Sequence, residues 1–206
     1  MVMSESGIQF DFDESYQIIK YDDTRFHKEQ FNQLLNSKGV DFVAASNKRV
    51  VFMEIKNCLG DEGNNRWRIE VRNKKRDTAP TNYDVSQRDS LDIEIPKKVA
   101  MTMAALGGVY SYPTPHRNAD ECLPVARLLF SEEIKNEKRD INVILVLEGA
   151  FGNGLETRND NAIRMRLGQY MERKLKWLRC KVSVIQAEDL EKTITGMKAT
   201  VQPSST

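Results

Sequence analysis

The chain has 206 residues, and its 31 Lys and Arg side chains nearly balance its 30 Asp and Glu side chains, so the formal net charge at pH 7 is +1. This balance excludes a strong overall basic bias, and contacts with nucleic acid would have to come from local clusters of charge. Three cysteines without a Cys-x-x-Cys pair argue against a disulfide framework or a zinc site and favour a reducing cytoplasm. An acidic N-terminus and the lack of an apolar run of ~18–20 residues predict neither a signal peptide nor a membrane span.

The first 36 residues contain two short alternating runs and one longer apolar period. Residues 8–12 and 16–21 alternate apolar and polar side chains, which predicts two strands. These strands are expected either to form a small hairpin or to supply a strand ahead of residue 41. Residues 22–36 predict a helix. Its apolar positions are Phe26, Phe31, Leu34 and Leu35, and its possible N-caps are Asp22, Asp23 and Thr24.

A β-hairpin is predicted over residues 39–56, where two apolar runs flank a polar turn. A two-residue turn at Asn47 and Lys48 sets the register of the hairpin. In that register Asp41 lies directly opposite Glu54, and directly opposed residues point to the same face of a sheet. One sheet face therefore gathers two carboxylates.

The two opposed carboxylates are expected to have a positive charge nearby, because like charges in directly opposed positions destabilise a strand pair. Mg²⁺ is commonly held by one or two carboxylates and would remove this repulsion. Lys56 lies two residues beyond Glu54, so it shares the face and can orient a water or neutralise charge at a phosphate. The alternative interpretation is a solvated sheet face with a cross-strand salt bridge.

This pattern resembles the PD-(D/E)xK nuclease superfamily, which has the restriction-endonuclease-like fold. Asp41 matches the metal-binding aspartate at the head of a strand, and residues 54–56, Glu-Ile-Lys, match the Glu-x-Lys of the next strand. The spacing is most similar to that of archaeal Holliday-junction resolvases. The resemblance covers residues 22–56 well and the rest of the chain only by element order. Val40 replaces the frequent proline, and the helix predicted before it leaves no room for the strand that usually precedes Asp41.

The resemblance implies an α/β fold in which a mixed sheet with an antiparallel meander carries the site and helices flank it, in an αβββαβ core. It implies a metal-dependent nuclease that hydrolyses phosphodiester bonds, with DNA as the expected substrate and a homodimer as a possible assembly. Asp41, Glu54 and the backbone carbonyl of Ile55 would hold Mg²⁺, for which Mn²⁺ can substitute. Lys56 would position or activate the attacking water.

Two other classes of function stay open. One is a catalytically inactive nucleic-acid-binding or regulatory protein with the same fold. The other is an interaction module with an unrelated α/β fold, in which Asp41 and Glu54 do not converge.

The remaining elements follow from periodicity and from helix-breaking residues. Trp67, Ile69 and Val71 alternate with charged residues, which predicts a half-buried strand over residues 66–73 and then a polar loop over 74–90. Pro96 suits the start of a helix that ends at the glycine pair 107–108. Helices are further expected at residues 123–137 and 161–178, strands at 141–147 and 180–186, a single domain over 1–195, and a disordered tail over 196–206.

Two basic segments are candidates for contact with a phosphate backbone. Residues 66–76 contain six basic side chains and one acid, and residues 164–181 contain seven basic side chains and one acid. The first segment follows the strand of Lys56 directly, so we expect it to contact nucleic acid. The second is as readily explained as a solvated helix face. The residues expected to bind nucleic acid are Arg66, Arg68, Arg72, Lys74, Lys75 and Arg76.

Overall fold

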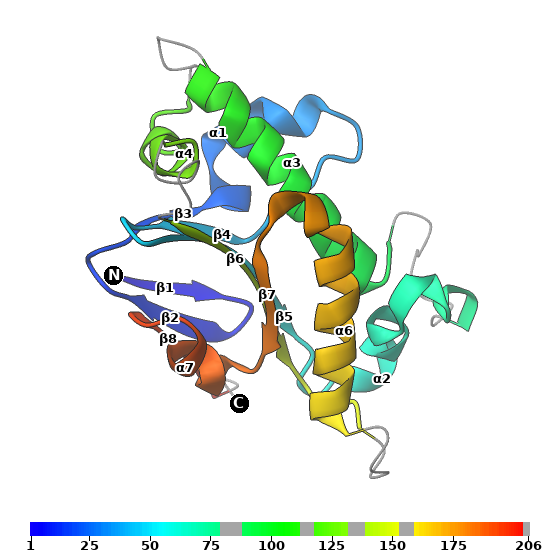
Figure 1. Cartoon of the computed structure of the whole chain (residues 1–206). Helices are drawn as coiled ribbons and strands as arrows, with labels where there is room; N and C mark the ends of the chain where they lie inside the picture. The colour runs from blue at the N-terminus through cyan, green and yellow to red at the C-terminus, as the bar shows by residue number, and fades with distance from the viewer. Residues whose placement is uncertain (79–87, 112–117, 132–138, 153–158, 204–206) are drawn as a thin grey trace.

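A computed structural model of the chain describes residues 1–78, 88–111, 118–131, 139–152 and 159–203. Its centre is a five-stranded mixed sheet with the strand order β3-β4-β5-β6-β7 (Figure 1). The first three strands form an antiparallel meander, and β6 and β7 continue the sheet in parallel with β5. This is the expected α/β class. The strands are β3 (Gln17–Lys20), β4 (Phe42–Ala45), β5 (Arg49–Asn57), β6 (Asp140–Glu148) and β7 (Lys181–Ile185).

The hairpin predicted around residue 47 is confirmed, including its register. Ala45 pairs with Val50 and Phe42 pairs with Met53. The backbone N–H of Ser46 donates to the Arg49 carbonyl at 2.9 Å and closes the two-residue turn. Because this register continues beyond β4, Asp41 is brought beside Glu54.

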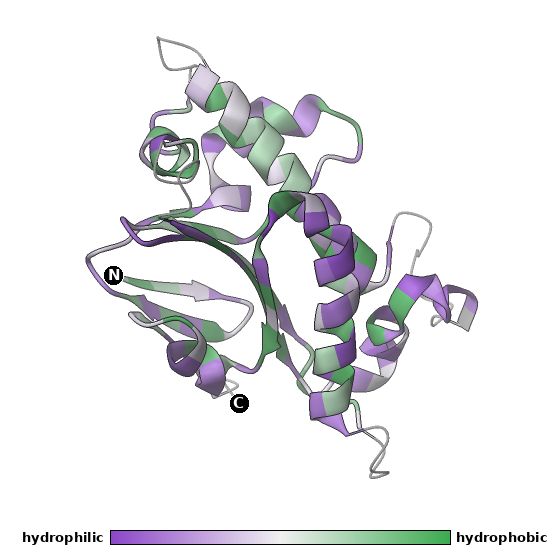
Figure 2. Ribbon diagram, in the orientation of Figure 1, coloured by the Kyte–Doolittle hydropathy of each residue, from purple (hydrophilic) through white to green (hydrophobic). Residues whose placement is uncertain are grey.

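Helices cover one face of the sheet. They are α3 (Leu91–Ser111), α4 (Leu123–Leu129) and α6 (Asp160–Lys174). Val43, Phe52, Val143 and Leu145 point from the strands into the core that these helices share with the sheet. Figure 2 shows hydrophobic residues along the strands and a mixture of hydrophobic and hydrophilic residues on α6, as expected for a helix that covers a sheet with one side. Among the described residues, no helix is both long and apolar enough to cross a membrane.

A second, three-stranded sheet with the order β1-β2-β8 covers the opposite face. Phe10, Phe12, Phe42 and Met53 meet in the second core between the two sheets. The central strands are therefore buried on both sides, which explains their continuous apolar sequences. The elements of this layer are β1 (Val2–Glu5), β2 (Ile8–Phe12), the 3-10 helix η8 (Ala187–Asp189), α7 (Leu190–Thr193) and β8 (Met197–Val201).

One expectation for the N-terminal segment is confirmed, because β3 pairs with β4 and supplies the strand ahead of Asp41. Two others are wrong. Residues 8–12 and 16–21 do not form a hairpin, because β2 pairs with β1 and β8. The helix predicted over residues 22–36 is reduced to short pieces, since Leu34 and Leu35 are exposed and do not extend an apolar face. These pieces are η1 (Tyr21–Asp23), α1 (Arg25–Glu29), which Thr24 caps, and η2 (Phe31–Gln33).

The strand predicted over residues 66–73 is wrong. The alternation of Trp67, Ile69 and Val71 correctly marked buried side chains, but the segment forms short helical turns. Strand β5 already has β4 and β6 as neighbours, so the segment after it finds no free edge there. The turns are α2 (Glu62–Asn65), η3 (Arg66–Ile69), η4 (Val71–Asn73) and η5 (Arg76–Thr78).

Helix α3 is longer than predicted at both ends. It begins five residues before Pro96, which there removes one backbone donor without ending the helix. It also continues through the glycine pair 107–108, and Gly107 packs close to the ring of Phe130. The segments 161–178 and 180–186 agree with α6, η7 (Lys176–Leu178) and β7. Residues 79–87 of the predicted loop and 132–138 of the predicted helix at 123–137 lie outside the described residues.

The disordered tail predicted from residue 196 is also wrong. Met197 is fully buried in the second core, and the strand that it begins pairs with β2. The Gly196 carbonyl accepts a hydrogen bond from Asp13 N–H at 2.8 Å, and Gln202 N–H donates to the Gly7 carbonyl at 2.9 Å. Lys198 and Thr200 are exposed and alternate with Met197, Ala199 and Val201, as expected for a strand with one solvated face. Only residues 204–206 lie outside the described part.

Replacement of Met197 by Ala should therefore destabilise the protein by about 2–5 kcal/mol, because it leaves a cavity in a closed core. Urea unfolding monitored by tryptophan fluorescence measures this loss. Lys198→Ala, on the neighbouring exposed position of β8, is the control and should change stability by less than about 0.5 kcal/mol. Equal stability of both variants and the wild type would contradict the packing of β8.

Candidate active site

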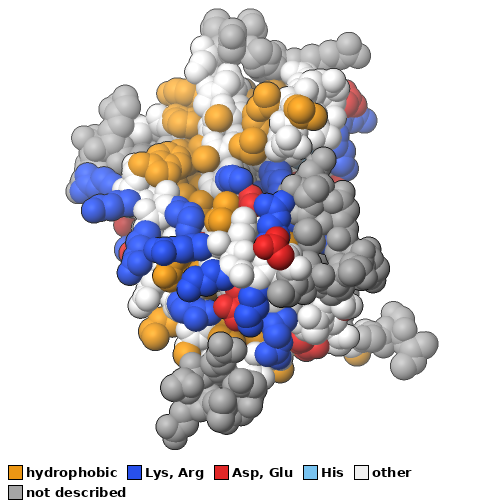
Figure 3. Space-filling view, turned by 90° about the vertical axis from the view of Figure 1, so that its right-hand side faces the viewer, with side chains coloured by type: hydrophobic (Ala, Val, Ile, Leu, Met, Phe, Trp, Pro, Cys, Tyr) orange, Lys and Arg blue, Asp and Glu red, His pale blue; other side chains and the backbone are white. Residues whose placement is uncertain are grey.

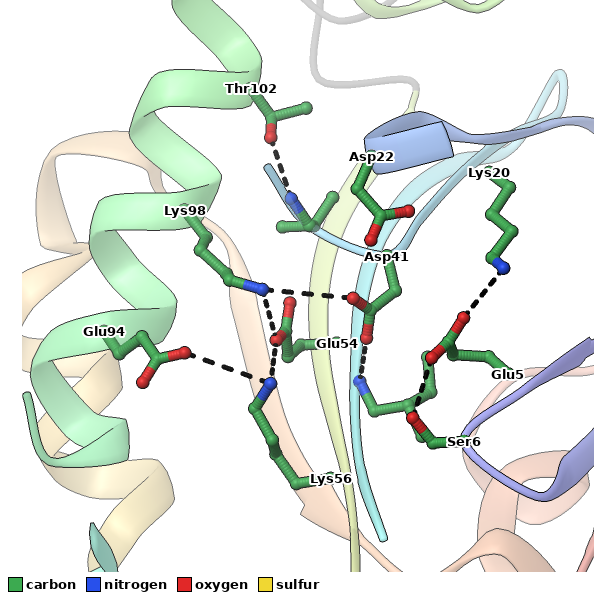
Figure 4. A network of polar contacts seen from close by, with 12 residues as sticks. Glu5, Ser6, Lys20, Asp22, Asp41, Glu54, Lys56, Glu94, Lys98 and Thr102 are labelled. Atoms are coloured by element: carbon green, nitrogen blue, oxygen red, sulfur yellow. Dashed lines mark hydrogen bonds and ion pairs between the residues drawn. The ribbon is translucent and has the colours of Figure 1, made fainter. Parts of the chain in front are cut away.

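Asp41, Glu54 and Lys56 meet on the face of the sheet that is covered by helices (Figure 4). Asp41 immediately precedes β4, and its Oδ2 accepts a hydrogen bond from the backbone N–H of Ile55 at 2.6 Å. Lys56 Nζ lies 2.5 Å from Glu54 Oε1. In a regular strand the N–H and C=O of one residue point to the same edge, so the Ile55 carbonyl also faces the Asp41 side of β5.

Helix α3 contributes three residues to this site that the sequence analysis missed. Lys98 Nζ lies 2.5 Å from Glu54 Oε1 and 3.9 Å from Asp41 Oδ1, and Glu94 Oε1 lies 3.9 Å from the Lys56 ammonium. The Thr102 hydroxyl accepts a hydrogen bond from the backbone N–H of Val40, the residue before Asp41. A signal for them was present, because residues 94, 98 and 102 are spaced by four and share one side of a helix.

The carboxylates of the site are withdrawn from solvent. Glu54 is 0% exposed and Asp41 is 6% exposed. Burial, and next the charge of Glu54, raise the pKa of Asp41 to about 7, against the opposing effect of Lys98. Burial works to lower the pKa of Lys56, but the charges of Glu54 and Glu94 outweigh it, and the pKa is raised overall. Lys56 is therefore a cation at neutral pH.

Two buried carboxylate oxygens in this region lack a hydrogen-bond partner among the described residues. They are Glu54 Oε2 and Asp22 Oδ1, and Asp22 lies close to Asp41 in Figure 4. Burial raises the pKa of Asp22. Such oxygens are the donors that Mg²⁺ takes. The residues therefore fit the metal in donor type, although no three acidic, His or Cys side chains of the described part are already arranged around an ion position.

The six basic residues of segment 66–76 do not act as one surface. Arg68 turns inward and pairs with Glu94 at 2.7 Å, so it forms part of the wall of the site. Lys75 lies 3.2 Å from Glu70, and Arg76 lies 3.8 Å from Asp89. The other three behave differently: Arg66 lines a cavity of about 290 Å³ between η3 and α6, and Arg72 and Lys74 are exposed.

Segments 66–76 and 164–181 lie side by side. The Arg72 and Arg173 guanidinium groups both lie over the Tyr170 ring, at 4.9 and 5.2 Å from its centroid. Figure 3 shows Lys and Arg side chains gathered on this face. We call it the basic surface, and its residues are Arg66, Arg72, Lys74, Arg166, Arg173 and Lys176. Lys174, beside it, pairs with Asp92 at 2.6 Å, which ties α6 to the first turn of α3.

The raised pKa of Asp41 predicts a specific pH dependence of stability in the metal-free protein. Between its ordinary value of 3.8 and about 7, the folded protein holds a proton at Asp41 that the unfolded chain releases. Stability contributed by this group is therefore lost as pH rises through that window. The Asp41→Asn side chain stays neutral at every pH, so the variant does not lose this stability. The free energy of unfolding of Asp41→Asn minus that of the wild type should therefore be about 2–3 kcal/mol larger at pH 8 than at pH 5.

Urea unfolding of both proteins in EDTA at the two pH values measures the difference. Parallel pH profiles would show that Asp41 is ionised throughout this range.

Comparisons with known proteins place the chain in a family but add no activity. No curated protein and no solved structure matches it. A family model described as a family of unknown function, DUF6661, matches residues 24–197. That range begins at the N-cap of α1 and ends at the first residue of β8, so it contains Asp41, Glu54, Lys56 and Lys98. Because the match extends over most of the chain, the protein belongs to the DUF6661 family.

Proposed function

We propose that the protein is a metal-dependent nuclease that hydrolyses phosphodiester bonds. The observation that carries the proposal is the convergence of Asp41, Glu54 and Lys56 at one end of the β4–β5 hairpin. The antiparallel meander β3-β4-β5, followed by α3 and the parallel strand β6, supports it, since the resemblance to PD-(D/E)xK nucleases implies this order of elements. Fold alone does not establish function, so the proposal rests on the residues of the site.

In this proposal Asp41, Glu54 and the Ile55 carbonyl hold Mg²⁺ or Mn²⁺. The bound metal would supply positive charge that stabilises the leaving oxygen of the phosphodiester. Lys56 is protonated at neutral pH, so its ammonium orients the attacking water and neutralises charge at the phosphate instead of abstracting a proton. Glu94 faces that ammonium, and Arg68 holds Glu94 in place.

The substrate and setting are proposed from the resemblance and from the surface. DNA is the proposed substrate, and the basic surface is its proposed contact with the phosphate backbone. A homodimer is proposed from the resemblance alone. The cysteines Cys58, Cys122 and Cys180 are all free thiols, which supports a reducing compartment such as the cytoplasm.

One observation favours the alternative of a non-catalytic nucleic-acid-binding protein. Lys56 and Lys98 already neutralise Glu54, so the hairpin does not need a metal to offset the repulsion between Asp41 and Glu54. Both candidates share the basic surface. They differ in whether the protein cuts its ligand.

The first test is cleavage of supercoiled, linear, branched and single-stranded DNA, and of RNA, with Mg²⁺, Mn²⁺ or EDTA. Asp41→Asn, Glu54→Gln and Lys56→Ala should each lower the cleavage rate by about 10²-fold or more, because the two acid variants weaken the hold on the metal and the lysine variant removes the cation that orients the attacking water. Lys48→Ala, exposed in the hairpin turn, is the control and should cleave like the wild type. Unaltered cleavage by Lys56→Ala would refute the assigned role of the lysine, and binding without cleavage by the wild type would favour the alternative.

The basic surface predicts a change in salt dependence. The double variant Lys74→Gln/Lys176→Gln should bind duplex DNA more weakly and about equally so for all sequences, because phosphate contacts do not read bases. The slope of log K against log salt should flatten by roughly 0.9 for each lost contact. Lys192→Gln/Lys198→Gln, in the layer of α7 and β8, removes the same charge elsewhere and is the matched control. Identical slopes for the two double variants would exclude this face as the nucleic-acid contact.

A further inference from the structure

Lys98 occupies an unusual place for a lysine. Its side chain is only 14% exposed, and its ammonium lies between the two acids that the proposed function assigns to a metal. Lys56 and Lys98 both contact the same oxygen, Glu54 Oε1, whereas Glu54 Oε2 has no partner among the described residues. A second lysine on an oxygen that already has one is not required to satisfy the hydrogen bonding of Glu54.

The charge of the site explains why a cation is present at this place. Asp41 and Glu54 lie side by side out of solvent, and two neighbouring buried carboxylates strongly disfavour joint ionisation. Lys98 is the group that approaches both of them, at 3.9 and 2.5 Å. A divalent metal would likewise place positive charge between the two carboxylates, and it would bring twice the charge of an ammonium.

The two lysines differ in how they are held. Lys56 belongs to the central strand, and Glu94 faces its ammonium from the other side. Lys98 reaches the acids from α3 through a flexible four-carbon stem, and no further acid besides Asp41 and Glu54 lies within 4.0 Å of its ammonium among the described residues. A lysine stem of this kind can turn its ammonium toward water without movement of the helix. Lys98 can therefore leave the site while Lys56 stays.

We propose that Lys98 fills the cation position between Asp41 and Glu54 in the metal-free protein and is displaced from it when a divalent cation binds. The inference rests on the proposed function in taking these two acids as metal ligands. Metal binding then includes the cost of removing the ammonium, so the apparent affinity of the wild type is weaker than that of the same two carboxylates without Lys98. The protein stays folded without metal because Lys98 replaces it.

The test is calorimetric titration of Mn²⁺ into the full-length protein at pH 8, with Lys98→Met as the variant. Methionine matches the unbranched apolar stem of lysine but lacks its ammonium and its charge. Lys98→Met should bind Mn²⁺ about tenfold more tightly than the wild type. Lys97→Met is the matched control, because Lys97 is the exposed neighbour on α3 and pairs with Asp89 outside the site. It should bind Mn²⁺ like the wild type, and Asp41→Asn/Lys98→Met should lose the gain.

A measurement on the wild type keeps the inference testable if Lys98→Met does not fold. Acetylation of lysines, followed by mass spectrometry, should label Lys98 slowly in EDTA and several times faster with Mn²⁺. Labelling of Lys97 should not change between the two conditions.

The outcomes separate this inference from the proposed function. Wild-type binding of Mn²⁺ that Asp41→Asn abolishes, with no gain in Lys98→Met and no change in Lys98 labelling, would overturn the exchange and leave the nuclease proposal standing. Tighter Mn²⁺ binding by Lys98→Met without cleavage of any nucleic acid would support the exchange and overturn the nuclease. Absence of Mn²⁺ binding in both proteins would overturn both.

Discussion

The buried carboxylate of Glu54 is the constraint on which the site depends. It lies without solvent exposure on the central strand, and removing the cationic partner of such a buried charge costs roughly 3–5 kcal/mol. One partner, Lys56, comes from the same strand, and the other, Lys98, comes from α3. The charge on the strand thus acts together with Ile95, Val99 and Leu106, the buried apolar side chains of α3, in holding this side of the helix against the sheet. Lys98 of α3, Glu54 and Lys56 of β5, and Asp41 just before β4 form one electrostatic unit, in which a change at any member alters the charge balance of the others.

Opposite charges are separated in space although the chain as a whole is nearly neutral. The first turn of α3 directs Asp92 and Glu94 inward, where they neutralise Lys174 and Arg68. The cations that remain around Tyr170 face outward (Figure 3). The same helix therefore supplies acids to the interior and leaves a basic surface beside them. This arrangement lowers the repulsion of a polyanion that approaches from the side of α6, since Asp92 and Glu94 are covered by their own counterions.

The parts of the fold that local patterns determine could be predicted from the sequence, and the parts that depend on distant partners could not. The register of the hairpin follows from a two-residue turn between apolar runs. That register predicts that Asp41 and Glu54 lie side by side. The alternation at Trp67 correctly showed burial, but no local signal reveals that β5 has no free edge. Lys98 was missed because a helix start placed at Pro96 left Glu94 outside the helix and hid the spacing of four that joins the two. The composition of the tail suggested disorder, but no local pattern shows that Met197 pairs with Phe12, which lies 185 residues earlier in the chain.

The pairing of β2 with β8 has a consequence for how the protein is made. Phe10 and Phe12 are translated long before β8, the strand that completes their layer. Contacts between such distant segments form late, and domains assemble from the N-terminus as synthesis proceeds. A nascent chain that stalls after β7 can build the helical layer and bring the acids together, but its β2 strand pairs only with β1 and lacks the partner strand β8. Until β8 has been made, the apolar side chains that it covers stay exposed, and such surface is prone to aggregate and is what chaperones bind.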